Sequence, residues 1–145
     1  MKRTLFIILG ICIISVIIIF YIYNNFVKEI MLSEKLNKEY ENYTEDIIVG
    51  SHLMTLINKT VDLNEKNNIS KDKKGLYMEN DTNSIKIEIK FIESDKTFSM
   101  EAISKLGSEE FVKNYSSRTF KCTKKEFHNI TGQIKYMLFE EVINL

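Results

Sequence analysis

The chain has no proline and no tryptophan, only two cysteines, and no excess of charge of either sign. Two cysteines are too few for a small domain held together by disulfides. The 20 basic and 20 acidic side chains cancel, so nothing indicates the basic face that binding to nucleic-acid phosphates requires. A length of 145 residues leaves room for one domain. We therefore predict neither a disulfide scaffold nor a nucleic-acid partner.

Residues 4–23 form an uncharged and strongly apolar run. At about 1.5 Å per residue, a helix of this length spans the roughly 30 Å hydrocarbon core of a membrane. Backbone groups in lipid must be paired within the segment, so the run must be helical there. Tyr21, Tyr23 and Phe26 fall where an interfacial aromatic belt is expected. Residues 1–23 are therefore predicted to be a cytoplasmic tip and a single transmembrane helix.

The charges that flank this run predict its orientation. Lys2 and Arg3 precede it, whereas Lys28 and Glu29 follow it and nearly cancel. The positive-inside rule then places the N-terminus in the cytoplasm and residues 24–145 outside the cell membrane. The alternative is a cleaved signal peptide, but the run is longer than the usual apolar region of one, and no small-x-small cleavage site follows it.

Cys12 lies inside the apolar run, in the segment Leu9-Gly10-Ile11-Cys12. This segment is similar to a bacterial lipobox, in which a small residue precedes the lipidated cysteine. Ile11 occupies the place of the small residue, and cleavage there would divide the span. We interpret Cys12 as a small apolar residue of a membrane helix.

An amphipathic stem helix is predicted over residues 24–46. Its apolar side chains recur at helical spacing, at Phe26, Ile30, Leu32, Leu36, Tyr40 and Tyr43. No proline or glycine lies between Ile11 and Val49, so one helix of about forty residues can run from the membrane into the outside medium. The apolar stripe must be covered, either by the following domain of the same chain or by copies or partners.

Residues 47–145 are predicted to form a small α+β domain. The apolar spacing favours helices over 52–64, 99–106 and 108–115, and strands over 85–91, 118–127 and 133–142. Ser51 and Ser108 are the expected N-caps, and Gly107 suits a position just beyond a helix. Consecutive strands with short loops indicate an antiparallel sheet with helices on one face.

The remaining segments of the domain are polar. Residues 64–75 have one apolar side chain and are predicted to be a solvated loop. Residues 80–83 are a cluster of turn formers, across which residues 76–79 are expected to pair with the strand over 85–91.

The sequence contains no phosphate-binding, zinc-protease, CxxC or nucleophile-elbow motif. Cys122 and His128 suggest a thiol–imidazole pair, but six residues of strand separate them by about 20 Å. We interpret Cys122 as buried and inert, His52 as a residue of the first turn of a helix, and His128 as a residue at the edge of a loop. A small hydrolase or redox enzyme using Cys122 or His128 is the third and least favoured class of function.

Oxygen-bearing side chains gather at two places, residues 62–64 and 79–81. An EF-hand starting at Asp62 would need Glu at its twelfth position, where Lys73 stands, so calcium binding is rejected. We predict no catalytic, cofactor-binding or metal-binding residue. Lys121, Lys124 and Lys125 are interpreted as a solvated guard of a strand edge rather than an anion site.

Six Asn-x-Ser/Thr sequons are present, at Asn42, Asn58, Asn68, Asn80, Asn114 and Asn129. The predicted topology exposes them outside the cytoplasm, where a eukaryotic secretory route could glycosylate them. In a bacterium, most of them would be an accident of composition, because Asn, Ser and Thr are all plentiful. Asn58, on a predicted helix, would be a poor acceptor.

An apolar helix, an amphipathic extension and a small antiparallel sheet together resemble type IV pilins and pseudopilins in outline. The processing motif of that family, a glycine followed by an apolar segment with Glu at the fifth position, is not matched, because Gly10 leads to Ser15. The segments 55–59, 80–87 and 120–123 are similar to those of small membrane-anchored proteins of low-GC Gram-positive bacteria, a group without established activity. This resemblance implies a bacterial source and no catalytic residue.

These observations favour a non-catalytic interaction or assembly module, pilin-like or part of a secretion apparatus. The expected partner is another protein, or a second copy bound through the stem helix. The alternative is a domain that binds or senses a small ligand. Its pocket is expected between the strand face of Ile85, Ile87 and Ile89 and the helix that carries Leu53 and Ile57.

Overall fold

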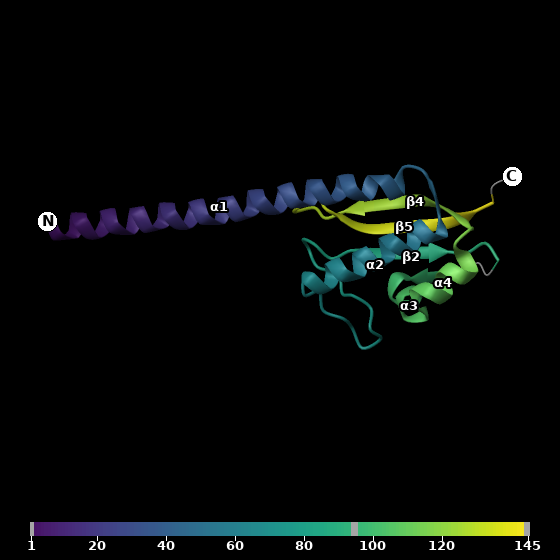
Figure 1. Ribbon diagram of the computed structural model, residues 1–145. Helices are drawn as coiled ribbons and strands as arrows, with labels where there is room; N and C mark the ends of the chain where they lie inside the picture. The colour runs from purple at the N-terminus through teal and green to yellow at the C-terminus, as the bar shows by residue number, and fades with distance from the viewer. Residues whose placement is uncertain (1, 94–95, 144–145) are drawn as a thin grey trace. The chain divides into compact units, whose positions relative to one another are not determined.

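The chain divides into two compact units, Met1–Leu32 and Ser33–Leu145. The computed structural model describes residues 2–93 and 96–143. One long helix, α1 (Lys2–Thr44), makes up the described part of the first unit and begins the second (Figure 1). Its 43 residues confirm the prediction of a single uninterrupted helix.

The first unit presents apolar side chains on all sides of its helix. Ile19 and Phe20 are each 67% exposed, and Gly10 has open space around it. A helix that is apolar all round and is not buried in protein has the character of a membrane span. In the part of the chain that the structure describes, one helix is long and apolar enough to cross a membrane, as the sequence predicts.

The C-terminal part of α1, from Ser33 to Thr44, belongs to the folded domain. Tyr40 is fully buried, and its hydroxyl lies 3.0 Å from Oγ1 of Thr60. Leu36 and Tyr43 pack against the same core and are partly buried. From residue 33 onward, the apolar stripe of the predicted stem is therefore covered by the chain's own domain.

The buried hydroxyl of Tyr40 makes the stability of the domain depend on pH. Thr60 donates its own hydroxyl proton to the carbonyl of Leu56, so Tyr40 is the donor to Thr60. Burial raises the pKa of Tyr40 to about 12, from 10.0. The folded state therefore holds this proton more tightly than the unfolded state, and the corresponding stability is present below pH 10 and lost as the pH rises toward 12.

We expect Tyr40→Phe to cost about 1 kcal/mol at neutral pH, the net value of one hydrogen bond. The variant should also lose less stability between neutral pH and strongly alkaline pH than the parent does. Chemical denaturation at a series of pH values, followed by near-ultraviolet circular dichroism, measures both effects. Equal alkaline losses in the two proteins would show that Tyr40 does not carry this dependence.

The domain contains a mixed five-stranded sheet. Its strands are β1 (Ile47–Val49), β2 (Lys86–Lys90), β3 (Thr97–Ser99), β4 (Thr119–Phe127) and β5 (Ile134–Val142), in the order β1-β4-β5-β2-β3. The antiparallel hairpin of β4 and β5 confirms the predicted C-terminal hairpin. The prediction of an antiparallel sheet is wrong for one pair, because β2 and β5 run parallel. The helices and strands between β2 and β5 in the sequence give the chain enough length to bring β5 back parallel to β2.

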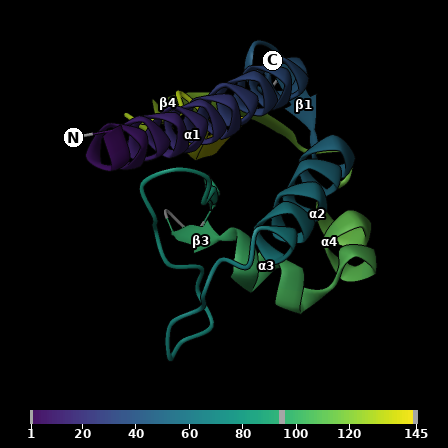
Figure 2. The ribbon, with the colours of Figure 1, turned by 90° about the vertical axis from the view of Figure 1, so that its left-hand side faces the viewer.

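Three helices complete the domain, α2 (Gly50–Lys66), α3 (Met100–Leu106) and α4 (Ser108–Tyr115). Alternation along the strands directs Ile87, Ile89 and Phe139 into the core, whereas Lys86 and Glu88 lie on the other face and are partly exposed. The three helices gather on one side of the sheet (Figures 1 and 2), and their apolar side chains belong to the same core as these strand residues. The domain is therefore of the predicted α+β class.

The helix starts differ from prediction in two cases. Ser51 and Ser108 are predicted N-caps, but α2 begins at Gly50 and α4 begins at Ser108 itself, after caps that make no side-chain hydrogen bond. At α3, by contrast, the Ser99 hydroxyl accepts from the N–H of Ala102. Gly107 lies between α3 and α4 with φ of +97°, a conformation that favours glycine. At the start of α2, the N–H of Gly50 instead donates to the carbonyl of Arg118, a tertiary contact in place of a capping side chain.

The segment 76–79 does not pair with β2, contrary to prediction. Tyr77 forms an isolated bridge with Lys71, and both sides of β2 are occupied by β3 and β5. The predicted turn over 80–83 is confirmed, since the Asn80 side chain accepts three backbone N–H groups.

Two asparagine side chains join helices to the sheet by bonding to backbone. Asn64 of α2 is fully buried; it donates to the carbonyl of Ile85 at 2.7 Å and accepts from the N–H of the same residue at 3.0 Å. Asn37 of α1 donates to the carbonyl of Gly132 and accepts from the N–H of Ile134. Each amide thereby satisfies backbone groups at the start of a strand.

Candidate functional site

An apolar pocket of about 320 Å³ opens at one end of the domain. It is formed by the segment after β2, by β3, by α3, and by the last residue of α4 with the chain just after it. Its lining residues are Phe91, Glu93, Phe98, Ala102, Ile103, Leu106, Tyr115 and Arg118. This volume lies at the lower end of the range for pockets that enclose small molecules or large side chains.

Aromatic rings form the walls of the pocket. The Phe91 ring is buried and lies edge-on to Phe98, with ring centroids 5.7 Å apart, and tilted against Tyr115 at 4.8 Å. Phe98 and Leu106 are 37% and 42% exposed, so the mouth of the pocket is also apolar. Rings in edge-on and tilted contacts leave edges and faces with which a further ring can pack in the same way.

One side of the pocket carries an ion-pair network. The Arg118 guanidinium donates to Glu141 at 2.9 Å and lies 3.2 Å from Glu93. The Glu141 carboxylate also accepts from the N–H of Ile92 and is nearly buried. The hydrogen bond to Glu141, and then that to Glu93, raises the pKa of Arg118. Arg118 is therefore held against Glu141, while the Glu93 carboxylate, 76% exposed, remains open to solvent.

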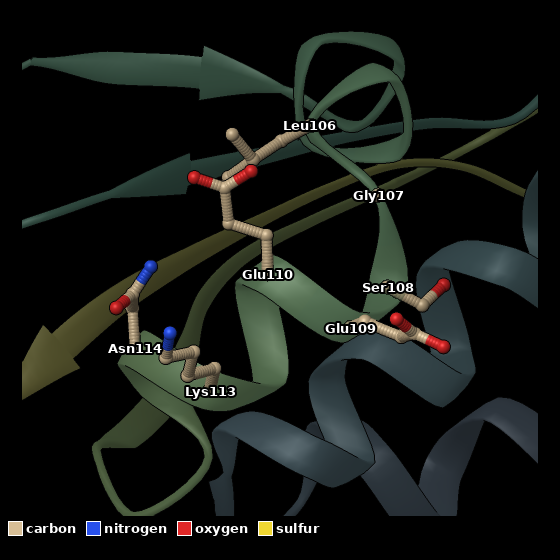
Figure 3. A pocket seen from close by; sticks show the side chains of 7 residues that line it. All are labelled: Leu106, Gly107, Ser108, Glu109, Glu110, Lys113 and Asn114. Atoms are coloured by element: carbon tan, nitrogen blue, oxygen red, sulfur yellow. The ribbon is translucent and has the colours of Figure 1, made fainter.

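A second, wider hollow of about 710 Å³ adjoins the pocket at Leu106, which lines both. Figure 3 shows Glu110 and Asn114 extending from α4 at this hollow. Its residues are Leu106, Gly107, Ser108, Glu109, Glu110, Lys113 and Asn114. The apolar pocket therefore has a polar neighbour in which carboxylates outnumber ammonium groups.

The ligand pocket that the sequence predicts is filled in the structure. Ile85, Ile89, Leu53 and Ile57 are fully buried, and Ile87 is 1% exposed. All five belong to the core, and none lines either hollow. The observed pocket was missed because its residues come from four separate segments, and no spacing in the sequence brings them together.

Cys122 and His128 have separate partners. The Cys122 thiol contacts the carbonyl of Lys124 and is half-buried, and burial raises the pKa of this thiol. His128 is buried, and its Nε2 lies 2.7 Å from the carbonyl oxygen of Ser84. The sequence places His128 correctly just after a strand but does not show that its ring joins two loops of the domain.

The remaining candidate residues from the sequence are His52 and the three lysines of β4. His52 is an exposed residue of the first turn of α2, as predicted. Lys121 lies where β4 pairs with β1, which is not a free edge, whereas Lys124 pairs with Glu126 and Lys125 donates to Thr44. The interpretation as an edge guard is therefore wrong for Lys121, because a short strand covers that part of β4.

The oxygen-rich segments do not form a metal site in the described residues. Asn64 is buried in α2 and bonds to Ile85, and Asn80 is occupied by its own turn. No group of three or more histidine, cysteine or carboxylate side chains gathers in residues 2–93 and 96–143 at a spacing that could hold a metal ion.

The sequon asparagines lie mostly on the surface. Asn42, Asn58, Asn68, Asn114 and Asn129 are exposed, whereas Asn80 is partly buried. Asn58 lies within α2, as predicted, and its amide donates a hydrogen bond to the Ser108 hydroxyl.

Searches against protein-family models, curated proteins and solved structures find no match to this chain.

Proposed function

We propose that this chain is a single-pass protein of the cell membrane whose extracytoplasmic domain is a non-catalytic interaction module. The observation that carries the proposal is the open aromatic pocket beside Leu106, which no side chain fills among residues 2–93 and 96–143. Apolar surface left open on a small domain commonly marks a binding site. The pocket gives the domain a place to hold an apolar group of a partner.

The proposed topology follows from Lys2 and Arg3 before the apolar run. In intact cells, we expect an added protease to degrade residues 24–145 and to spare the N-terminal tip, because only the domain lies outside. Intact mass of the protein recovered from membranes should be that of the full chain. A domain that is cut only after the cells are opened would reverse the orientation, and a mass lacking the first residues would show processing.

Structural roles of Cys122 and His128 support the non-catalytic part of the proposal. The Cys122 thiol has a raised pKa, and such a thiol is a poor nucleophile. Nε2 of His128 is hydrogen-bonded to the backbone carbonyl of Ser84 and not to a hydroxyl or thiol. These two side chains are the ones that an enzyme hypothesis from the sequence would use.

Photocrosslinking in membranes tests the interaction role. With a photoreactive residue in place of Leu106, we expect a specific adduct, and the same residue in place of Asp62, exposed on α2, should give none. Adding Ala102→Phe should abolish the adduct, because the new ring fills the pocket from α3. An adduct that persists in this variant would place the contact elsewhere and contradict the proposal.

A small-ligand site remains the second candidate, on the volume and apolar walls of the same pocket. A low-mass adduct at Leu106, with no protein attached, would favour it.

Self-association through the stem is confined to α1 before the domain, where Phe26, Met31 and Leu32 are 43%, 65% and 58% exposed. Cysteine crosslinking at Leu32 in membranes tests that role separately.

A further inference from the structure

We infer that the pocket binds a segment of a partner polypeptide in which an apolar, preferably aromatic, side chain is flanked by basic residues. This inference rests on the proposed function and names the chemistry of its partner. The aromatic walls select the anchor, and the charges around the mouth select its neighbours.

The charges that line the two adjoining hollows are mainly negative. The carboxylates are Glu93, Glu109 and Glu110, and the cations are Lys113 and Arg118. Arg118 donates to the nearly buried Glu141, which compensates its charge from within the domain. The remaining exposed carboxylates therefore outnumber the one remaining cation, Lys113, among these lining residues.

Position makes this excess useful for recognition. Glu93 lines the apolar pocket, and Glu109 and Glu110 line the neighbouring hollow, which shares Leu106 with it. An anchor side chain in the pocket therefore lies near carboxylates of both hollows. Basic residues next to the anchor meet opposite charge, whereas acidic ones meet like charge, which is costly at an interface.

The shape of the pocket favours a ring as the anchor. Phe91, Phe98 and Tyr115 already pack in edge-on and tilted contacts, and a further ring can add to this arrangement. An anionic anchor is disfavoured because Arg118, the cation at the pocket, is already bonded to Glu141 and Glu93.

The absence of tryptophan from the chain allows a direct test. Three short blocked peptides, each with one central Trp flanked by Lys, by Glu or by Gly, are titrated with the full-length protein in a non-ionic detergent. Trp fluorescence then comes from the peptide alone, and its anisotropy rises as the peptide binds. We expect the Lys-flanked peptide to bind about tenfold more tightly than the Glu-flanked one, with the difference shrinking as salt screens the charges.

Two substitutions at Ala102 assign the binding to the pocket, and a double variant tests the charge preference. Ala102→Phe should weaken binding of the Lys-flanked peptide about tenfold or more by filling the pocket, whereas Ala102→Ser, which leaves it open, should not. Glu93→Gln combined with Glu110→Gln should remove most of the preference for Lys over Glu. Ala102 is exposed, so neither of its substitutions disturbs the core.

The outcomes separate this inference from the proposed function. Equal binding of all three peptides, still abolished by Ala102→Phe, would overturn the charge preference and leave the pocket as an interaction site. No binding of any peptide would overturn the inference, and the crosslink at Leu106 would then decide the proposed function alone. Tighter binding of the Lys-flanked peptide that depends on both sets of variants would establish the inference.

Discussion

Replacing Asn64 by alanine is expected to cost about 3 kcal/mol of the free energy of unfolding, from two buried backbone groups left without partners. The Asn64 amide both donates to the carbonyl of Ile85 and accepts from its N–H. Both residues are fully buried, so water cannot replace the lost contacts without entering the core. Chemical denaturation of the full-length protein in detergent, followed by near-ultraviolet circular dichroism of the domain's tyrosines, measures the loss.

Asn58→Ala is the matched control, since it makes the same change on the same helix. Asn58 is exposed, and its contact with Ser108 is a surface hydrogen bond, so the expected cost is below about 1 kcal/mol. Similar losses in the two variants would show that the backbone contacts of Asn64 have no special weight.

Gly50→Ala is expected to destabilise the domain by about 3 kcal/mol, although helix propensity alone predicts a gain of up to about 1 kcal/mol. A Cβ atom on Gly50 would lie 1.9 Å from the carbonyl oxygen of Tyr115, where α2 meets the end of α4. That neighbour is backbone and cannot rotate away. The N–H of Gly50 also donates to the carbonyl of Arg118 at 2.8 Å, which fixes the close approach.

Helix propensity and the steric clash at Gly50 predict changes in stability of opposite sign, so the measurement distinguishes between them. Gly10→Ala serves as the control, because a Cβ at Gly10 meets nothing within 4 Å, and the variant should leave the stability of the domain unchanged. A Gly50→Ala protein as stable as the parent would mean that α2 and α4 can separate at little cost. Loss of stability should also weaken crosslinking at Leu106, since Tyr115 at the end of α4 and Arg118 just after it line the pocket.

Local patterns in the sequence predicted most of the helices and strands. The alternation over 85–91, the C-terminal hairpin and the helix around Leu53 and Ile57 are all present with shifted ends. These patterns are informative because burial on one face imposes a period of two on a strand and of 3.6 on a helix. The sequence leaves open whether the domain or a partner covers the stripe that includes Tyr40, and the contact of Tyr40 with Thr60 decides for the domain.

Contacts between distant residues could not be predicted in the same way. The parallel pairing of β2 with β5, the double hydrogen bond of Asn64 and the close approach at Gly50 join segments far apart in the chain. Neither a period nor a turn signal reports such pairs, because each depends on how all the elements pack together.

The sequence by itself determined the apolar helix, the charges on either side of it and the α+β character of the domain, because these depend on the chemistry of consecutive residues. Only the tertiary structure decided where the open pocket lies. Phe91, Phe98, Leu106 and Tyr115 come from different segments, and packing brings them to one end of the domain. The same packing fills the predicted pocket around Ile87 with core side chains, since burial of apolar surface leaves little open space where apolar faces of helix and sheet meet.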